Sequence, residues 1–138
     1  MLDSLLLVNW AAVAVATVLS YVLGALWFTP LFGRAWDRAL GTTRVKGERF
    51  PPVYYLVPLA SCLLGATAVG VLVVAVAADG WADAVVLGLL VGVGLSAAVS
   101  FTDALTPVMP HPLRYGAVTG SYHVLCSVIA ALVVTAMP

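Results

Sequence analysis

Charged residues are scarce in this sequence. Only 9% of its 138 residues are Asp, Glu, Lys or Arg, whereas soluble domains contain about 25%. Such a low content excludes a water-soluble enzyme of this size and a disordered chain. Six basic residues are balanced by six acidic ones, so there is no excess positive charge to attract nucleic-acid phosphates. We therefore expect no nucleic-acid partner.

Cysteine and the common catalytic motifs are lacking as well. Two cysteines are too few for a disulfide scaffold, and they do not have the spacing of a metal-binding pair. The sequence contains no Gly-x-Ser-x-Gly, no His-Glu-x-x-His and no phosphate-binding loop. Its one histidine in an apolar segment has at most one carboxylate nearby, which is too few ligands for zinc or haem. We expect no enzymatic activity, no cofactor and no metal.

Long apolar runs, by contrast, dominate the chain. Hydrophobic residues make up 63% of it, and about 20 consecutive apolar residues suffice to cross a bilayer as a helix. Four runs reach this length, at residues 5–28, 53–78, 84–105 and 115–137. The sequence thus predicts an all-α polytopic membrane protein. Its residues 1–138 are expected to form one domain, a compact bundle of four transmembrane helices.

The positions of the basic residues predict the orientation. All six lie within residues 29–52 or at Arg114, in the two loops that share one side of the membrane. The positive-inside rule places this side in the cytoplasm and both termini outside, in the inner (plasma) membrane. Between Phe32 and Leu40, apolar residues recur at helical spacing, which predicts a short helix along the inner membrane surface. An ordinary basic loop is the alternative.

Small residues recur at four-residue spacing, a pattern typical of transmembrane helices that approach each other closely. Two such lines occur in the third and fourth segments: Gly88, Gly92, Ser96 and Ser100, and then Gly116 and Gly120. They predict a tight bundle and a homo-oligomer, from dimer to tetramer, with the line from 88 to 100 as the contact between copies. Packing within one chain is the alternative.

His123 is the one histidine that lies inside a predicted transmembrane helix. Its helical neighbours Thr119, Gly120, Cys126 and Ser127 are small or polar, so its ring is expected to face protein and not lipid. An ionisable group inside the membrane indicates a function by default, as a proton relay, a metal ligand or a substrate contact. A neutral histidine that only bonds a helix carbonyl or hydroxyl is the structural alternative.

Three further polar residues are candidates. Asp103 lies near the inner end of the third segment, where it can pair with His123, and Arg114 lies nearby. A simple position at the membrane interface is the alternative for Asp103. Asn9 lies in the first segment, where an asparagine forms a hydrogen bond between helices more often than it binds a ligand.

The segment Gly24–Trp36 and the pair Tyr122-His123 carry distinctive motifs. The first reads Gly-Ala-Leu-Trp-Phe-Thr-Pro-Leu-Phe-Gly-Arg-Ala-Trp. These motifs resemble bacterial membrane proteins grouped as domain of unknown function 1761, over nearly the whole chain. Since that family has no assigned activity, the resemblance implies four helices and no function. It also implies one cytoplasmic-side site that includes Trp27, Pro30, Trp36, Tyr122 and His123.

The buried polar groups on the third and fourth helices favour a small channel or transporter for an ion or a small solute, assembled as a homo-oligomer in the lipid bilayer. A non-transporting scaffold or accessory subunit, whose polar residues only hold the bundle together, is the alternative. The functional centre is expected in the cytoplasmic half, around His123, because Asn9 is the one strongly polar group of the outer half.

Overall fold

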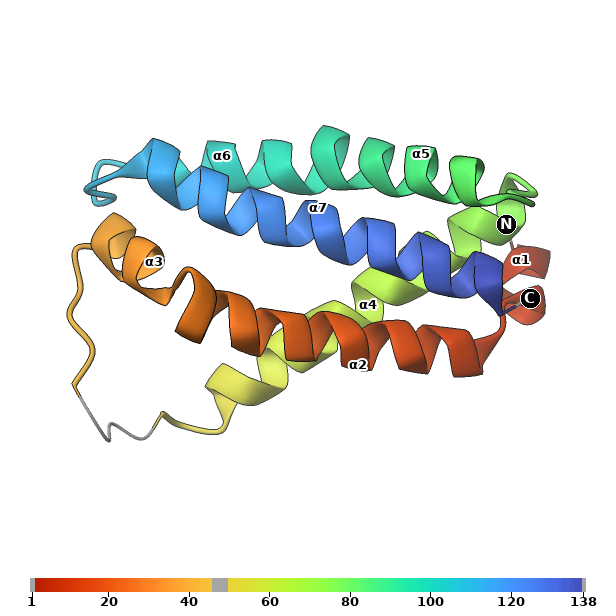
Figure 1. Cartoon of the computed structure of the whole chain (residues 1–138), viewed down its shortest axis with the longest axis horizontal. Helices are drawn as coiled ribbons and strands as arrows, with labels where there is room; N and C mark the ends of the chain where they lie inside the picture. Colours follow the sequence, from red (N-terminus) through yellow and green to blue (C-terminus); the bar gives the residue numbers. More distant parts are fainter. Residues whose placement is uncertain (1, 46–49, 138) are drawn as a thin grey trace.

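The computed structural model describes residues 2–45 and 50–137, which are helical and contain no strand. In these residues, four spans are long and apolar enough to cross a membrane: Trp10–Leu31, Val53–Ala75, Trp81–Ala104 and Pro112–Ala136. They pack into a compact bundle (Figure 1), so the predicted fold class is confirmed. Two basic residues of the loop between the first two spans, Lys46 and Arg49, lie outside the described residues. We call the end of the bundle next to this loop the inner end and the opposite end the outer end, as labels of position alone.

The first span begins later than its apolar run predicts. A short helix, α1 (Leu2–Leu7), comes first, and Asn9 then interrupts the helix with an extended backbone. The Asn9 side-chain oxygen accepts from two N–H groups of the next helix, at 2.9 and 3.2 Å. It thereby caps α2 (Trp10–Leu26). The continuous helix expected from residue 5 is therefore wrong, although the Asn9 amide does donate across helices, to the carbonyl of Met137 at 3.1 Å.

The inner end of the first span departs from α-helical bonding. Pro30 has no N–H, which breaks the regular ladder of hydrogen bonds. The N–H of Phe32 instead donates to the carbonyl of Trp27, five residues back, at 2.8 Å. This pattern defines a π-helical segment, η1 (Trp27–Leu31). Such segments occur frequently at functional sites.

A short helix, α3 (Gly33–Leu40), lies in the inner loop where the apolar spacing predicts one. It ends at Gly41, whose φ of +68° suits glycine. The helix contacts α7 (Pro112–Ala136). In addition, the N–H of His111 donates to the carbonyl of Ala39 at 3.3 Å. The helix is thus fastened to the inner end of the bundle instead of lying free along the membrane surface.

The last helix, α7, is the central element, because it contacts every other span. The third span has three parts: α5 (Trp81–Val91), a π-helical segment η2 (Gly92–Ala97) and α6 (Ala98–Ala104). Figure 1 shows both chain ends and the α4–α5 turn at one end of the bundle. Helix α3 and the α6–α7 loop lie at the other end, so the basic loops share one side.

The glycines of α5 and η2 pack against the backbone of α7. A Cβ atom added at Gly88 would lie 2.6 Å from the Cα atom of Val128, and one added at Gly92 would lie 2.7 Å from the Cα atom of Val124. No side chain fits at these distances. The expected contact between copies through Gly88 and Gly92 is therefore wrong, because these residues pack within the chain.

The small residues farther along the two helices complete the same interface. Gly116 of α7 lies against the ring of Phe101, and Gly120 lies against Ala97. On α6, Ser100 is buried, and its hydroxyl donates to the carbonyl of Ser96 at 2.9 Å. Both predicted lines of small residues therefore serve the pairing of the third span with α7.

The second span, α4 (Val53–Ala75), is packed along only half of its length. Its outer half completes a core of alanine and valine side chains: Val8, Ala12, Val13, Ala16, Ala66, Val69, Val73, Ala84, Ala130, Ala131 and Val134. Its inner half, residues 53–61, is exposed at every position. The helix crosses the bundle obliquely (Figure 1), and a cavity lies between it and α7.

Candidate functional site

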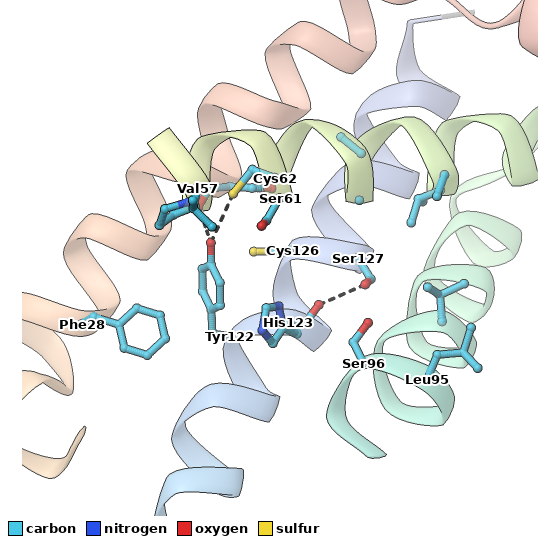
Figure 2. A pocket seen from close by; sticks show the side chains of 17 residues that line it. Phe28, Val57, Ser61, Cys62, Leu95, Ser96, Tyr122, His123, Cys126 and Ser127 are labelled. Carbon is cyan, nitrogen blue, oxygen red and sulfur yellow. Dashed lines mark hydrogen bonds between the residues drawn. The ribbon is translucent and has the colours of Figure 1, made fainter. Parts of the chain in front are cut away.

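A cavity of about 420 Å³ occupies the space between α4 and α7. Its walls also include α2, η1 and the α5–η2 segment (Figure 2). The polar side chains that line it come from all of these parts except η1: Ser20, Ser61, Cys62, Ser96, Tyr122, His123, Cys126 and Ser127. The remainder of the lining is apolar. The cavity extends from the exposed inner turns of α4, at Val57 and Pro58, to the middle of the bundle, at Val69 and Ser127.

A second cavity of about 410 Å³ lies between the η2–α6 segment and α7. Its polar lining is Ser96, Ser100, Asp103, Tyr115, Thr119 and His123. The buried hydroxyl of Thr119 has no hydrogen-bond partner within the described residues. Leu95, Ser96 and His123 line both cavities. These three residues therefore form the wall between the two spaces.

The His123 side chain is half-buried in this wall. Neither of its ring nitrogens has a hydrogen-bond partner within residues 2–45 and 50–137. The Tyr122 ring lies beside it, with the two ring centres 5.1 Å apart. The imidazole is therefore available to a molecule in either cavity, as a donor through one nitrogen and an acceptor through the other.

Tyr122, the next residue along α7, is buried and fixed by three neighbours. Its hydroxyl donates to the carbonyl of Ser20 in α2 at 3.1 Å and lies 3.5 Å from the Cys62 sulfur of α4. A Cβ atom at Gly24 would lie 2.8 Å from the same hydroxyl oxygen, so the phenol fits only over a glycine. Tyr122 thus joins α7 to α2 and α4 at the inner end of the cavity (Figure 2).

Aromatic rings connect Tyr122 to the inner loop. The Phe28 ring meets Tyr122 edge-on at 5.1 Å between ring centres, and on its other side it meets Trp36 of α3 at 5.4 Å. Such edge contacts contribute about 1 kcal/mol each beyond the area they bury. Trp27 faces α7, where its indole N–H donates to the carbonyl of Val118 at 3.0 Å. The rings therefore hold η1 and α3 against α7.

Arg44, in the inner loop, binds to the aromatic group formed by Phe28 and Trp36. Its guanidinium donates to the Asp37 carboxylate at 2.8 Å and to the carbonyl of Phe28 at 2.6 Å. It also lies 5.6 Å from the centre of the Trp36 ring, within the range of a cation–π contact. A Cβ atom at Gly33 would lie 2.9 Å from the same Phe28 carbonyl oxygen, so this approach also requires a glycine.

The structure brings some of the predicted residues together and separates others. Trp36, Tyr122 and His123 belong to one connected group. Pro30 is exposed and shapes η1 without lining either cavity. Asp103 lines the second cavity, but the described residues show no hydrogen bond or ion pair between it and His123 or Arg114. The expected Asp103–His123 pair is therefore not formed, and Arg114 is exposed away from both cavities.

Phe28, Arg44 and Cys62 are among the site residues that sequence reasoning missed. Phe28 lies within the family-like segment Gly24–Trp36, yet its place between two other rings depends on the π-helical turn that follows it. Arg44 had counted only as one of several loop charges. Cys62 lies in a uniformly apolar run, where the sequence gives no signal that it meets Tyr122.

The site has few groups that can bind a metal. In the part of the chain that the structure describes, no three His, Cys, Asp or Glu side chains lie close enough together to hold a metal ion. The polar groups of the cavities are hydroxyls, thiols and one imidazole. They are suited to hydrogen bonding with a small molecule.

Comparison with known proteins identifies a family. Residues 11–135 match the family described as "Protein of unknown function (DUF1761)". No curated protein and no solved structure matches the chain. The matched range contains both motifs of the resemblance, the segment Gly24–Trp36 and the pair Tyr122-His123. The chain therefore belongs to the DUF1761 family, a family of unknown function.

Proposed function

We propose that this membrane protein is a transporter for a small solute, with its binding centre at His123. The observation that carries the proposal is the position of His123, which lines both cavities and whose imidazole ring has no hydrogen-bond partner in the described chain. Ionisable groups at membrane depth are costly, and they therefore occur mostly where they serve a function. The proposal includes no catalysis, because no carboxylate is hydrogen-bonded to the imidazole in the described residues.

The packing favours a carrier over an open channel. The cavities extend from the inner half to the middle of the bundle, whereas the outer end is filled by alanine and valine side chains such as Ala12, Val13 and Ala131, all at most 1% exposed. A solute bound at His123 therefore has no open path to the outer surface in this conformation. Transport in this proposal requires a rearrangement of α4, whose inner half is the least packed part of the four spans.

The functional unit in this proposal is a homo-oligomer. The face of η2, α6 and α7 that forms the second cavity includes Asp103, which is exposed. Polar groups at membrane depth associate with protein more favourably than with acyl chains. A second copy over this face would shield the Asp103 carboxylate from lipid.

The end of the bundle with the basic loops faces the cytoplasm of the cell in this proposal, and both termini face outward from the inner membrane. To test this, Thr43→Cys in the inner loop and Asp79→Cys in the α4–α5 turn are each introduced after Cys62 and Cys126 are replaced by alanine. A membrane-impermeant maleimide should label the Asp79→Cys variant in intact cells. It should label the Thr43→Cys variant only after lysis, and the reverse pattern would contradict the orientation.

Transport is tested by solute uptake into proteoliposomes. The His123→Ala variant should lower the initial uptake rate at least about tenfold, equivalent to about 1.4 kcal/mol in the barrier, because the centre loses its exchangeable donor and acceptor. His111→Ala is the matched control, since His111 is exposed in the inner loop and lines neither cavity. Its rate should stay within about twofold of the unaltered protein.

A non-transporting scaffold or accessory subunit is the second candidate. It is favoured by the closed alanine and valine packing of the outer half. A scaffold predicts no uptake of any ion or solute across a range of pH values, together with an intact oligomer of the His123→Ala variant on native mass spectrometry. That combination would replace the transporter proposal.

A further inference from the structure

The chemistry of the larger cavity restricts what it can hold. None of its seventeen lining residues is Asp, Glu, Lys or Arg. A permanently charged molecule that left water for this space would meet no opposite charge, and burial of an unpaired charge is strongly unfavourable. The cavity therefore selects for uncharged molecules.

Free hydrogen-bonding groups in the cavity are few. The Ser127 hydroxyl donates to the carbonyl of His123 at 3.0 Å, and the Tyr122 hydroxyl is bonded to α2. The groups without a hydrogen bond in the described residues include the hydroxyls of Ser61 and Ser96 and the imidazole of His123. Figure 2 shows Ser61 and Ser96 on opposite sides of α7. A ligand with one or two polar groups, and apolar elsewhere, matches this arrangement.

The exposed wall of α4 indicates the route by which a ligand arrives. Val57, Pro58 and Ser61 line the cavity and are also exposed on the surface of the bundle. Ser61 lies eight residues after the start of α4, about 12 Å along the axis at 1.5 Å per residue. This depth is inside the hydrocarbon core of a bilayer. The wall therefore faces acyl chains, and a molecule dissolved in the bilayer reaches the cavity sideways.

We infer that the larger cavity binds an uncharged amphiphile taken from the bilayer, an apolar chain or ring that carries a hydroxyl or carbonyl group. The polar group of the ligand forms a hydrogen bond with Ser61, Ser96 or His123, and its apolar part lies along Val57, Leu95 and their neighbours. The cavity volume of about 420 Å³ falls in the range of small-molecule sites. The inference rests on the site proposed above and specifies its ligand class.

Gly65 and Gly94 provide a matched pair of variants for the test. A Cβ atom at either position meets no atom within 4 Å, so the first side-chain atom of a substitution at either one causes no clash. Gly65 lines the cavity, whereas Gly94 lines neither cavity. The variant Gly65→Phe places a ring in the cavity, and Gly94→Phe places the same ring outside it.

The probe is decanol that carries a photoreactive diazirine, added to proteoliposomes and followed by mass spectrometry of the labelled peptides. Labelling near Ser61 and His123 should fall at least about tenfold in the Gly65→Phe variant, equivalent to about 1.4 kcal/mol of binding. In Gly94→Phe it should be unchanged, and excess plain decanol should suppress it. A carboxylate and a quaternary ammonium of the same chain length should label weakly.

Each outcome decides the inference independently of transport. Equal labelling in Gly65→Phe and in the unaltered protein would show non-specific insertion and overturn the inference, as would stronger labelling by either charged analogue. Specific decanol labelling without solute uptake would leave the amphiphile site standing and refute the transporter. Uptake of an ion without decanol labelling would support the transporter and refute the amphiphile site.

Discussion

Replacing Gly88 with leucine should separate α5 from α7 and lower the melting temperature in detergent by about 10 °C or more, the effect of roughly 3 kcal/mol of destabilisation in a chain of this size. The physical reason is that the new Cβ atom would lie 2.6 Å from the Cα atom and 2.9 Å from the backbone nitrogen of Val128. Backbone atoms of a helix cannot turn aside as a flexible side chain can. The two helices must therefore move apart along their length.

Gly94→Leu is the control for this experiment. Gly94 lies on the same span and gains the same side chain, but a Cβ atom there meets nothing within 4 Å. Leucine also favours the helix more than glycine by about 0.8 kcal/mol, so this variant should melt at the same temperature as the unaltered protein or slightly above it. If Gly88→Leu melted like Gly94→Leu, the close approach of α5 to α7 would be refuted.

The same glycines show what a sequence pattern can and cannot predict. Four-residue spacing indicates that a helix has a face smooth enough for a backbone to approach. It does not identify the approaching helix, because a helix of the same chain and a helix of a second copy both require small residues on that face. Gly88 and Gly92 were therefore recognisable as packing residues, while their partner, α7, required the fold.

The four spans themselves were predictable because length and hydropathy suffice to mark a membrane-crossing helix. The start of the first span was not, because hydropathy ignores the capping chemistry of Asn9. The oblique path of α4 was not predictable either. Its residues are apolar on every side, and positions that face lipid look the same as positions that face a neighbouring helix. The cavity beside α7 follows from that path, so it too was hidden.

The His123 region was recognisable because an ionisable group among small polar neighbours is rare in a membrane helix. The Asp103–His123 pair failed because closeness to a helix end fixes depth but not the distance between side chains. Asp103 does reach the same cavity as His123. The aromatic link through Phe28 depends on η1, whose π-helical turn cannot be read from Pro30 alone, since most prolines simply kink or end a helix.

Truncation of Tyr122 to alanine should destabilise the inner half of the bundle by about 3–5 kcal/mol, the range for loss of a large buried aromatic side chain. Tyr122 is 8% exposed, and it contacts α2, α4 and η1 together. Since the inner half of α4 is exposed at every position from 53 to 61, little other packing there can compensate. Chemical unfolding in detergent, followed by tryptophan fluorescence, measures the loss, because Trp36 packs against Phe28, the neighbour of Tyr122.

Tyr122→Phe divides this effect between the ring and the hydroxyl. It keeps the edge contact with Phe28 and removes the hydrogen bond to the Ser20 carbonyl together with the weak one to the Cys62 sulfur, so it should cost about 1 kcal/mol. Equal losses for the two variants would mean that the hydroxyl alone joins the helices and that the ring contributes nothing. A small loss of stability in both variants would mean that Tyr122 does not hold α2 against α7. The closed inner end of the cavity would then depend on other contacts. The loss of stability in Tyr122→Ala should be about three to five times the loss in Tyr122→Phe. The reason is that a buried ring excludes far more surface from lipid and water than one hydroxyl does.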